Sequence, residues 1–291
     1  EANKSVGFVQ LLLQEKNRPR CDVFWNNEII GTLRLQKAGF LQPYDTESAR
    51  AFPSHARAED RTWTAFAARA RVLLVNRDRV GDGPPPDSLA DFANPKWKSQ
   101  AVMAKPFFGT TATHLACLFQ KLGAEKTGGF LKSMLDNGLQ IAPGNKQVAE
   151  WVREGATPSG QPVAFGITDT DDAIIECRAH AHVSLVFPDQ NANGMAPLGS
   201  LFIPNSLSIP RGCPNPDAAL KLVDFLLSPE TEKRLAEGPS AQIPLNPNVK
   251  ASLPPEVKTP AQVQAMAVDW KTIVDSWEDC QRLAKSLFRA R

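Results

Sequence analysis

Hydrophobic positions along the chain alternate between helical spacing and short runs that suit buried strands. Apolar residues three or four positions apart predict helices over residues 1–16, 29–38, 88–92, 114–122, 126–137, 146–154, 173–179, 216–227, 229–236 and 259–287. Short apolar or alternating runs predict strands over residues 20–25, 70–76, 101–104, 163–167, 183–187 and 201–209. Because strands and helices alternate, the sequence predicts an α/β fold with a largely parallel sheet.

Length and breaker residues indicate how this pattern is divided. The chain has 291 residues, about twice a common domain size of about 150, so we expect one large or two medium domains. A cluster of glycine and proline at Gly81–Pro86 marks a crossing between domains or a linker. The longest apolar runs, Val72–Val75 and Leu222–Leu227, fall short of the about 20 residues that span a bilayer. Glu1 is not a translation start and nothing resembles a signal peptide, so we expect a processed or truncated chain.

Charge and cysteine content exclude several classes of function. The 33 lysine and arginine residues exceed the 31 aspartate and glutamate residues by only +2, which is too balanced for a protein that binds nucleic acid. Hydrophobic residues make up 42% and charged residues 22%, so a disordered or coiled-coil chain is excluded. The five cysteines are widely spaced without a CxxC pair, so a zinc ribbon is absent, and we expect most of them to be small buried residues.

Three polar segments follow predicted strands, at the sheet edge where α/β proteins bind ligands. They are Asn26–Glu28, Gly109–Thr113 and Thr168–Asp172. Gly109–Thr113 stands at a helix start, whose backbone N–H groups and hydroxyls suit an anion. Thr111 or Thr113 as a simple helix cap explains the same residues equally well.

Three carboxylates lie within four residues in Thr168–Asp172. Such crowding is costly unless a cation, an arginine or backbone N–H groups neutralise it. Capping of the next helix explains Asp171 and Asp172, whereas Asp169 and Thr170 stand next to the strand end and are better placed to contact a ligand. Arg69 and Arg71 begin the strongest strand, and either one of them points inward as an anion partner or both are solvated.

Several longer segments resemble the periplasmic solute-binding proteins of ABC importers, type 2 class, in their ferric-iron-binding branch. The segments are Asp22–Trp25, Leu35–Tyr44, Arg69–Val72, Leu89–Lys98 and Pro216–Glu230. The resemblance implies a two-lobed, type II periplasmic-binding-protein architecture, with two hinge crossings near Val75–Asp78 and Leu201–Asn205 and a ligand trapped by closure. It places residues 1–76 and 204–291 in lobe 1 and residues 77–203 in lobe 2. Relatives usually begin with a strand, a helix and a second strand ahead of the segment that matches Glu1.

The resemblance also suggests a site, with one chemical difference. Relatives hold Fe(III) through paired phenolates where Asp169–Asp171 stand here, and the single tyrosine, Tyr44, lies in another segment. By this resemblance, Gly109–Thr113 matches the loop that holds the synergistic anion in relatives, and Arg69 matches an arginine that contacts this anion. Asn26–Glu28 matches a cleft loop of the first lobe. The expected ligand-binding residues are Trp25, Asn26, Asn27, Glu28, Arg69, Gly109, Thr110, Thr111, Thr113, Thr168, Asp169, Thr170 and Asp171. Glu28, Asp169 and Asp171 are the expected metal ligands.

We therefore expect a non-enzymatic, monomeric protein of the periplasm or the secreted fraction. It would deliver a small polar ligand or a metal–anion pair, iron included, to an ABC permease, without binding nucleic acid. A metal ion with a synergistic anion is the one cofactor that the resemblance suggests. Two alternatives stay open: a phosphatase of the haloacid-dehalogenase type with Asp169 as nucleophile and Asp171 as acid/base, and a ligand-sensing receptor module on the same fold.

Overall fold

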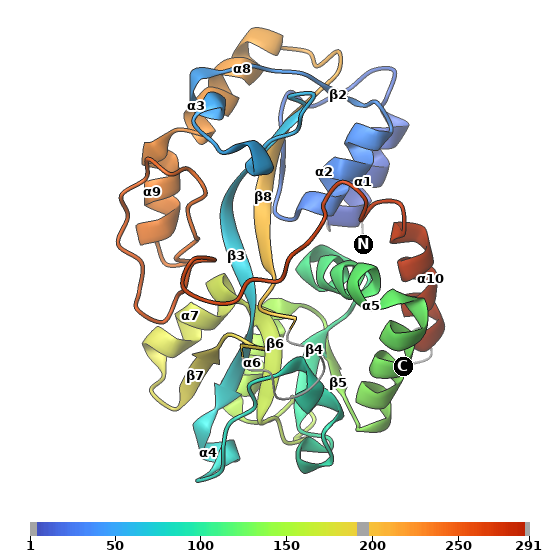
Figure 1. Cartoon of the computed structure of the whole chain (residues 1–291), viewed down its shortest axis with the longest axis vertical. Coiled ribbons are helices and arrows are strands. Elements are labelled where there is room, and N and C mark those ends of the chain that lie inside the picture. Colours follow the sequence, from blue (N-terminus) through green and yellow to red (C-terminus); the bar gives the residue numbers. More distant parts are fainter. Residues whose placement is uncertain (1–4, 191–197, 289–291) are drawn as a thin grey trace. The chain divides into compact units, whose positions relative to one another are not determined.

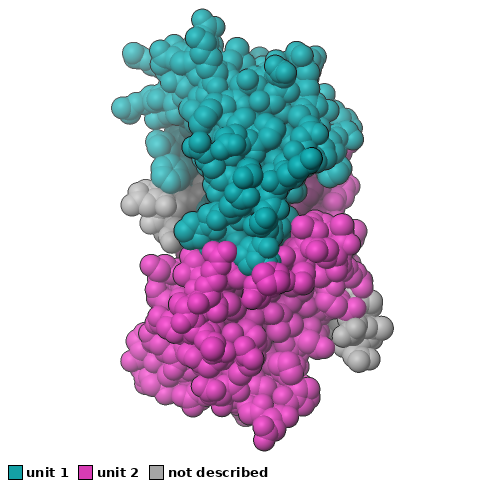
Figure 2. Space-filling view, turned by 90° about the vertical axis from the view of Figure 1, so that its left-hand side faces the viewer, with its two compact units in different colours: residues 1–69, 203–254 teal, residues 70–202, 255–291 magenta. Residues whose placement is uncertain are grey.

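The computed structural model describes residues 5–190 and 198–288. Two compact units share these residues, and Figure 2 colours them separately. Unit 1 comprises Glu1–Arg69 and Ile203–Pro254, and unit 2 comprises Ala70–Phe202 and Pro255–Arg291. The strand β3 (Trp63–Asn76) begins in unit 1 and ends in unit 2.

Unit 1 is built on β8 (Phe202–Pro210), which pairs antiparallel with β1 (Phe24–Asn26) and with β2 (Leu41–Gln42). The first half of β3 is the other neighbour of β8. Helix α1 packs on α2, and α3 packs on α8. The helices of unit 1 are α1 (Ser5–Gln14), α2 (Ile29–Lys37), α3 (Glu47–Arg50), η1 (Ser54–Ala56), α8 (Pro216–Leu226) and α9 (Pro229–Glu237).

Unit 2 has a parallel core of three strands with antiparallel strands beside it. β4 (Ala101–Ala104) lies between β5 (Gln140–Ala142) and β6 (Phe165–Asp169) and runs parallel to both. The second half of β3 pairs antiparallel with β6 and with β7 (Val183–Val186). The helices of unit 2 are α4 (Arg77–Val80), η2 (Leu89–Ala93), η3 (Pro95–Trp97), α5 (Gly109–Asp136), α6 (Asn145–Glu154), α7 (Thr170–Ala179) and α10 (Trp277–Phe288).

An apolar core holds unit 2 together. The β3 residues of unit 2, Ala70–Asn76, are all buried, and β6 and β7 pair with them. Phe165 on β6 packs against the rings of Phe92 at 4.9 Å and Trp97 at 5.7 Å. This aromatic cluster packs the sheet of unit 2 against η2 and η3 and thereby stabilises the strands that carry the site.

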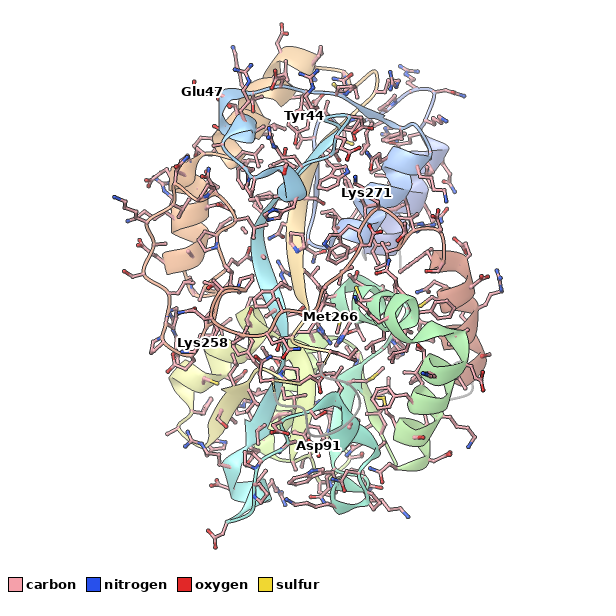
Figure 3. All side chains as sticks on the ribbon, in the orientation of Figure 1. Tyr44, Glu47, Asp91, Lys258, Met266 and Lys271 are labelled. Carbon is pink, nitrogen blue, oxygen red and sulfur yellow. The ribbon has the colours of Figure 1, made fainter. Side chains whose placement is uncertain are left out.

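A predicted strand and a predicted helix have bounds that differ widely from those observed. The strand expected at 70–76 begins seven residues earlier, because Trp63–Arg69 extends the same strand beside β8. The helix expected over 259–287 is confined to α10. Met266 and Ile273 before it are buried without belonging to a helix. Met266, labelled in Figure 3, donates its backbone N–H to the Ser200 carbonyl at 2.8 Å.

The chain also divides at positions that differ from the expected lobes 1–76 with 204–291 and 77–203. It passes between the units at 69/70, at 202/203 and a third time at 254/255. Residues 255–291 therefore belong to unit 2, since α10 packs along α5, as Figure 1 shows. Gln120 on α5 reinforces this by donating to the Asp269 carbonyl at 2.8 Å and to the Thr272 hydroxyl at 3.0 Å.

Candidate functional site

A buried ion pair stands at the carboxyl edge of the unit 2 sheet. Arg71 on β3 lies directly opposite Asp169, the last residue of β6. The guanidinium Nη1 and the carboxylate Oδ1 are 2.7 Å apart, and the two side chains are only 0% and 4% exposed. A buried charge is tolerated when it is paired and hydrogen-bonded, so each of these residues requires the other.

The Asp169 carboxylate has further donors on two neighbouring helices. Its Oδ2 accepts from the Thr110 hydroxyl at 2.6 Å and from the Asn145 side-chain amide at 2.8 Å. The Asn145 oxygen in turn accepts from Arg71 Nη1 at 3.1 Å and from the Thr111 hydroxyl at 3.2 Å. Arg71, Thr110, Thr111, Asn145 and Asp169 thus form one connected cluster, which we call the arginine–aspartate cluster.

Three helix starts meet at this cluster, and none of them has a side-chain cap. α5 begins after Phe108, α6 after Gly144 and α7 after Asp169, and in each case the side chain of that N-cap residue accepts no hydrogen bond from the first turn. A helix start exposes N–H donors and the positive end of the helix dipole. Thr110, Asn145 and Asp169, one residue from each start, are hydrogen-bonded to one another. The three positive helix ends therefore converge.

The remaining predicted residues of unit 2 support this arrangement. Gly109 has φ of +61°, a region that favours glycine, and so allows the chain to turn directly into α5. Thr168 donates to the Asn145 carbonyl at 3.1 Å, and Thr170 accepts from the Ala70 N–H at 3.1 Å. Thr113 is fully buried one turn into α5. The helix predicted to begin at residue 114 thus begins five residues earlier, at Gly109.

Asp171 and Asp172 bring two more carboxylates to the start of α7. One carboxylate oxygen from each of Asp169, Asp171 and Asp172 lies within 4.8 Å of the others. Oxygen donors in this number suit a hard cation. The same two residues occupy the first helical turn, where the helix dipole stabilises negative charge. Asp169 itself is already neutralised by Arg71.

Glu28, in unit 1, is the N-cap of α2. Its two carboxylate oxygens accept from the backbone N–H groups of Ile30 at 2.8 Å and Gly31 at 3.1 Å. Asn26 donates to the same carboxylate at 3.3 Å. This arrangement explains why the glutamate is buried at a helix start, whereas Asn27 beside it is exposed.

Trp25 and Arg69, the other predicted residues of unit 1, meet through Asn205. The Asn205 side-chain oxygen accepts from Trp25 Nε1 at 3.4 Å and from Arg69 Nη2 at 3.1 Å. Trp25 is 42% exposed and packs its ring against Phe66 at 5.2 Å. The resemblance singled out Arg69 as the anion partner, but the arginine in the arginine–aspartate cluster is Arg71.

Three residues of these networks are absent from the predicted site: Arg71, Asn145 and Asn205. The sequence offers Arg69 and Arg71 equally as the anion partner, and the pattern of the strand does not show which of the two contacts the anion. Asn145 follows β5, a strand of only three residues that the apolar pattern does not reveal. Asn205 lies within β8, where nothing in the sequence distinguishes it from a residue that only supports the strand.

Tyr44, labelled in Figure 3, lies in the core of unit 1. Its hydroxyl is 2.8 Å from the Thr64 hydroxyl and donates to the Leu207 carbonyl at 3.0 Å. Burial raises the pKa of the phenol above its ordinary value. The Tyr44 hydroxyl is thus engaged by hydrogen bonds within unit 1.

Comparisons with known proteins place the chain in a family. Residues 32–272 match the family model described as bacterial extracellular solute-binding protein. Iron uptake protein A1 of Synechocystis sp. is 25% identical over 259 residues, which are 84% of this chain and 69% of that protein. The major ferric iron-binding protein of Neisseria meningitidis is 25% identical over 272 residues, covering 89% of this chain and 76% of that protein.

Solved structures show the same fold. Iron-bound HitA from Pseudomonas aeruginosa matches with a TM-score of 0.84 at 20% identity, over 98% of this chain and 88% of that chain. AfuA from Actinobacillus pleuropneumoniae, with fructose-6-phosphate bound, matches with a TM-score of 0.84 at 21% identity, over 99% of this chain and 89% of that chain. The predicted fold of a type II periplasmic binding protein is confirmed.

The comparisons lend no support to the phosphatase alternative. In the described ranges, 5–190 and 198–288, no helix combines the length and apolar character needed to cross a membrane. The family match extends over 241 of the 291 residues, that is, 272 minus 32 plus one. The chain belongs to the bacterial extracellular solute-binding protein family.

Proposed function

We propose that this chain captures a small anionic solute outside the cytoplasm for an ABC permease, and that the solute's anionic group binds at the three helix starts of unit 2. The observation that carries this proposal is the convergence of α5, α6 and α7 on the arginine–aspartate cluster without a side-chain cap on any of them. Helix starts of this kind bind phosphate and carboxylate groups through backbone N–H donors.

The starts of α5 and α6 favour an anion, because neither helix has an acidic residue in its first turn. Arg71 and Asp169 neutralise one another at 2.7 Å, whereas Asp171 and Asp172 keep negative charge at the start of α7. Each helix end is equivalent to about +0.5 elementary charge. A phosphate monoester carries about −1.5 to −2 charges near pH 7, so the ends of α5 and α6 would attract it. The AfuA structure, which holds fructose-6-phosphate, supports a phosphorylated solute as the first class to test.

A metal–anion pair, iron included, is the second candidate ligand. The approach of Asp169, Asp171 and Asp172 within 4.8 Å favours it, as do relatives whose names refer to iron. In this case an anion would occupy the helix starts and the aspartates of α7 would supply oxygen ligands. Of the three expected metal ligands, Glu28 caps α2 and Asp169 pairs with Arg71, so Asp171 is the one best suited to a cation.

Calorimetric titration distinguishes the two ligands. Fructose 6-phosphate, inorganic phosphate and Fe(III) with citrate would each be added to the purified protein. Binding of the sugar phosphate without metal, and without release of phosphate, supports a non-enzymatic solute-binding protein. Binding of Fe(III) with its anion but not of either phosphate, lost in Asp171→Asn, would support the metal–anion pair.

A single glycine allows the helix-start mechanism to be tested. Gly144 precedes α6 with an extended backbone, φ −167° and ψ 174°, that any residue adopts. Gly144→Asp would supply α6 with its own anionic cap, and Gly144→Asn a neutral cap of similar quality. A Cβ at this position would meet only the flexible end of Gln147, at 3.1 Å.

We expect Gly144→Asp to weaken phosphate-ester binding at least about tenfold, which corresponds to about 1.4 kcal/mol, without loss of thermal stability. Gly144→Asn should weaken binding several-fold less, because it adds no charge. Equal affinity of the wild type and Gly144→Asp would refute binding at the helix starts. If none of the three solutes binds the wild type, the proposed ligand class is wrong.

A further inference from the structure

A small, partly open cavity in unit 2 borders Arg71 and Thr111 of the arginine–aspartate cluster. Its volume is about 40 Å³. Residues of α5, η2 and the sheet line it, and most of them are apolar. The apolar residues include Leu89, Phe92, Met103, Leu118, Phe130 and Met134. Arg71, Thr111 and His114 supply the polar part of the wall.

Two residues of this wall each have a buried nitrogen atom without a hydrogen-bond partner among residues 5–190 and 198–288. The two atoms are Arg71 Nε and His114 Nε2. The other two nitrogens of the Arg71 guanidinium are bonded to Asp169, Thr110, Asn145 and Thr111. A buried polar atom left without a partner costs about 1–3 kcal/mol, so two of them on residues that line one cavity call for a ligand.

The charge state of His114 restricts that ligand. The side chain is only 5% exposed. Burial, and secondarily the positive charge of Arg71, lowers the pKa of the imidazole to about 3. At neutral pH the ring is uncharged, so it offers one nitrogen as an acceptor and the other as a donor. A neutral ligand that both accepts and donates can therefore join Arg71 Nε–H to His114 Nε2.

Size and polarity select water. A water molecule needs about 10–15 Å³ of such volume and two to four polar partners, and this cavity supplies the space and two partners. A cation would be repelled by Arg71. An anion would have to be buried against an apolar wall beside a guanidinium that Asp169 already neutralises, which is costly.

We propose that this cavity binds an ordered water that bridges Arg71 Nε–H and His114 Nε2, and that His114 is thereby a positioning residue for the Arg71 guanidinium. Asp169 and its neighbours hold the two terminal nitrogens of that group, and the water holds the third. With all three nitrogens engaged, the plane of the guanidinium is fixed. The inference concerns the protein without ligand and stands whether or not the proposed solute binds.

A high-resolution crystal structure of the wild-type protein is the direct test. We expect solvent density within hydrogen-bond distance of both Arg71 Nε and His114 Nε2. A second crystal, pressurised with xenon, shows whether the cavity is dry, because apolar cavities take up xenon. Xenon bound there, with no solvent density between the two nitrogens in the first crystal, would overturn the proposal.

The positioning role is tested by the ¹H–¹⁵N resonance of Arg71 Nε–H. His114→Leu removes the acceptor, His114→Gln keeps an acceptor, and Met134→Leu alters the same wall without touching a polar group. We expect the resonance to move and its exchange with solvent to quicken at least about tenfold in His114→Leu, with partial restoration in His114→Gln.

A response to Met134→Leu as large as that to His114→Leu would show that only packing matters and would refute the positioning role. If His114→Leu does not fold, the comparison of the wild type with His114→Gln and Met134→Leu remains. In that case, a shift in Met134→Leu as large as the shift in His114→Gln counts against the proposal.

Discussion

The Arg71–Asp169 pair should be among the strongest pairwise interactions in unit 2. We would replace each residue alone and both together, as Arg71→Met, Asp169→Leu and the double variant. The two charged groups are 2.7 Å apart and almost fully buried, and the carboxylate also accepts from Thr110 and Asn145. Removing either charge leaves the other buried without its partner.

The expected magnitude follows from that burial. Breaking a buried pair by removing one partner costs about 3–5 kcal/mol, whereas replacing both partners with apolar side chains is often neutral. Each single variant should therefore lose about 3 kcal/mol or more in the free energy of unfolding. The double variant should be no less stable than the worse single variant, which makes the coupling energy at least about 3 kcal/mol.

Urea unfolding followed by circular dichroism measures these differences, with the slope against urea compared between variants. The exposed Arg50–Asp45 pair, at 3.0 Å, is the matched control, because water screens it and its coupling should be close to zero. Additive single effects at Arg71 and Asp169 would refute the reasoning, because they would mean that the two charges are not desolvated together.

Three further predictions concern groups that the structure buries or caps. Burial lowers the pKa of His114 from the ordinary value of 6.5 to about 3. As the pH falls, the unfolded chain therefore binds a proton at this residue before the folded chain does. The contribution of His114 to the free energy of unfolding is complete above pH 6.5 and falls by up to about 1.4 kcal/mol per pH unit toward pH 3. Denaturation at several pH values should show this slope in the wild type and a shallower one in His114→Leu, and identical slopes would contradict it. Glu232 accepts backbone N–H groups from Ala67, Leu245 and Asn246, yet burial raises its pKa above 4.5, so its stabilising contribution is complete below that pH and declines above it. The stability advantage of the wild type over Glu232→Gln should therefore shrink between pH 4 and pH 7, and an advantage that grows over this range would show the sign to be wrong. Ser228 caps α9 through the Thr231 N–H at 3.3 Å, so Ser228→Ala should cost about 1 kcal/mol of unfolding free energy while Ser228→Asp should not, and equal losses in both variants would indicate a role other than capping.

Helix positions in this chain followed from local signals. α8 and α9 begin with a proline at the first turn, and the observed bounds, Pro216–Leu226 and Pro229–Glu237, lie within one residue of those predicted. α6 ends at Gly155, which adopts the left-handed conformation with φ of +68°. Such signals act within a few residues, so a sequence reveals them without knowledge of the fold.

Strands were predicted less completely, because their limits depend on partners distant in sequence. β3 gains its first seven residues beside β8, more than 130 positions away along the chain. β5 has only three residues and exists through its pairing with β4. The segment 259–276 has apolar residues at helical spacing, but it forms no helix and buries residues such as Ile273 all the same.

By itself, the sequence determined the α/β class, the family resemblance and the polar segments at the ends of β4 and β6, because periodicity and helix-start chemistry are local properties. Only the tertiary structure decided which arginine joins the site. Arg69 and Arg71 are two positions apart on one strand, so alternation puts them on the same face, and the register of β3 against β6 sets Arg71 opposite Asp169. The convergence of α5, α6 and α7 likewise arises from the parallel order of β5, β4 and β6. The sequence does not reveal it, because the proposed site is made of backbone N–H groups, which every residue type except proline carries.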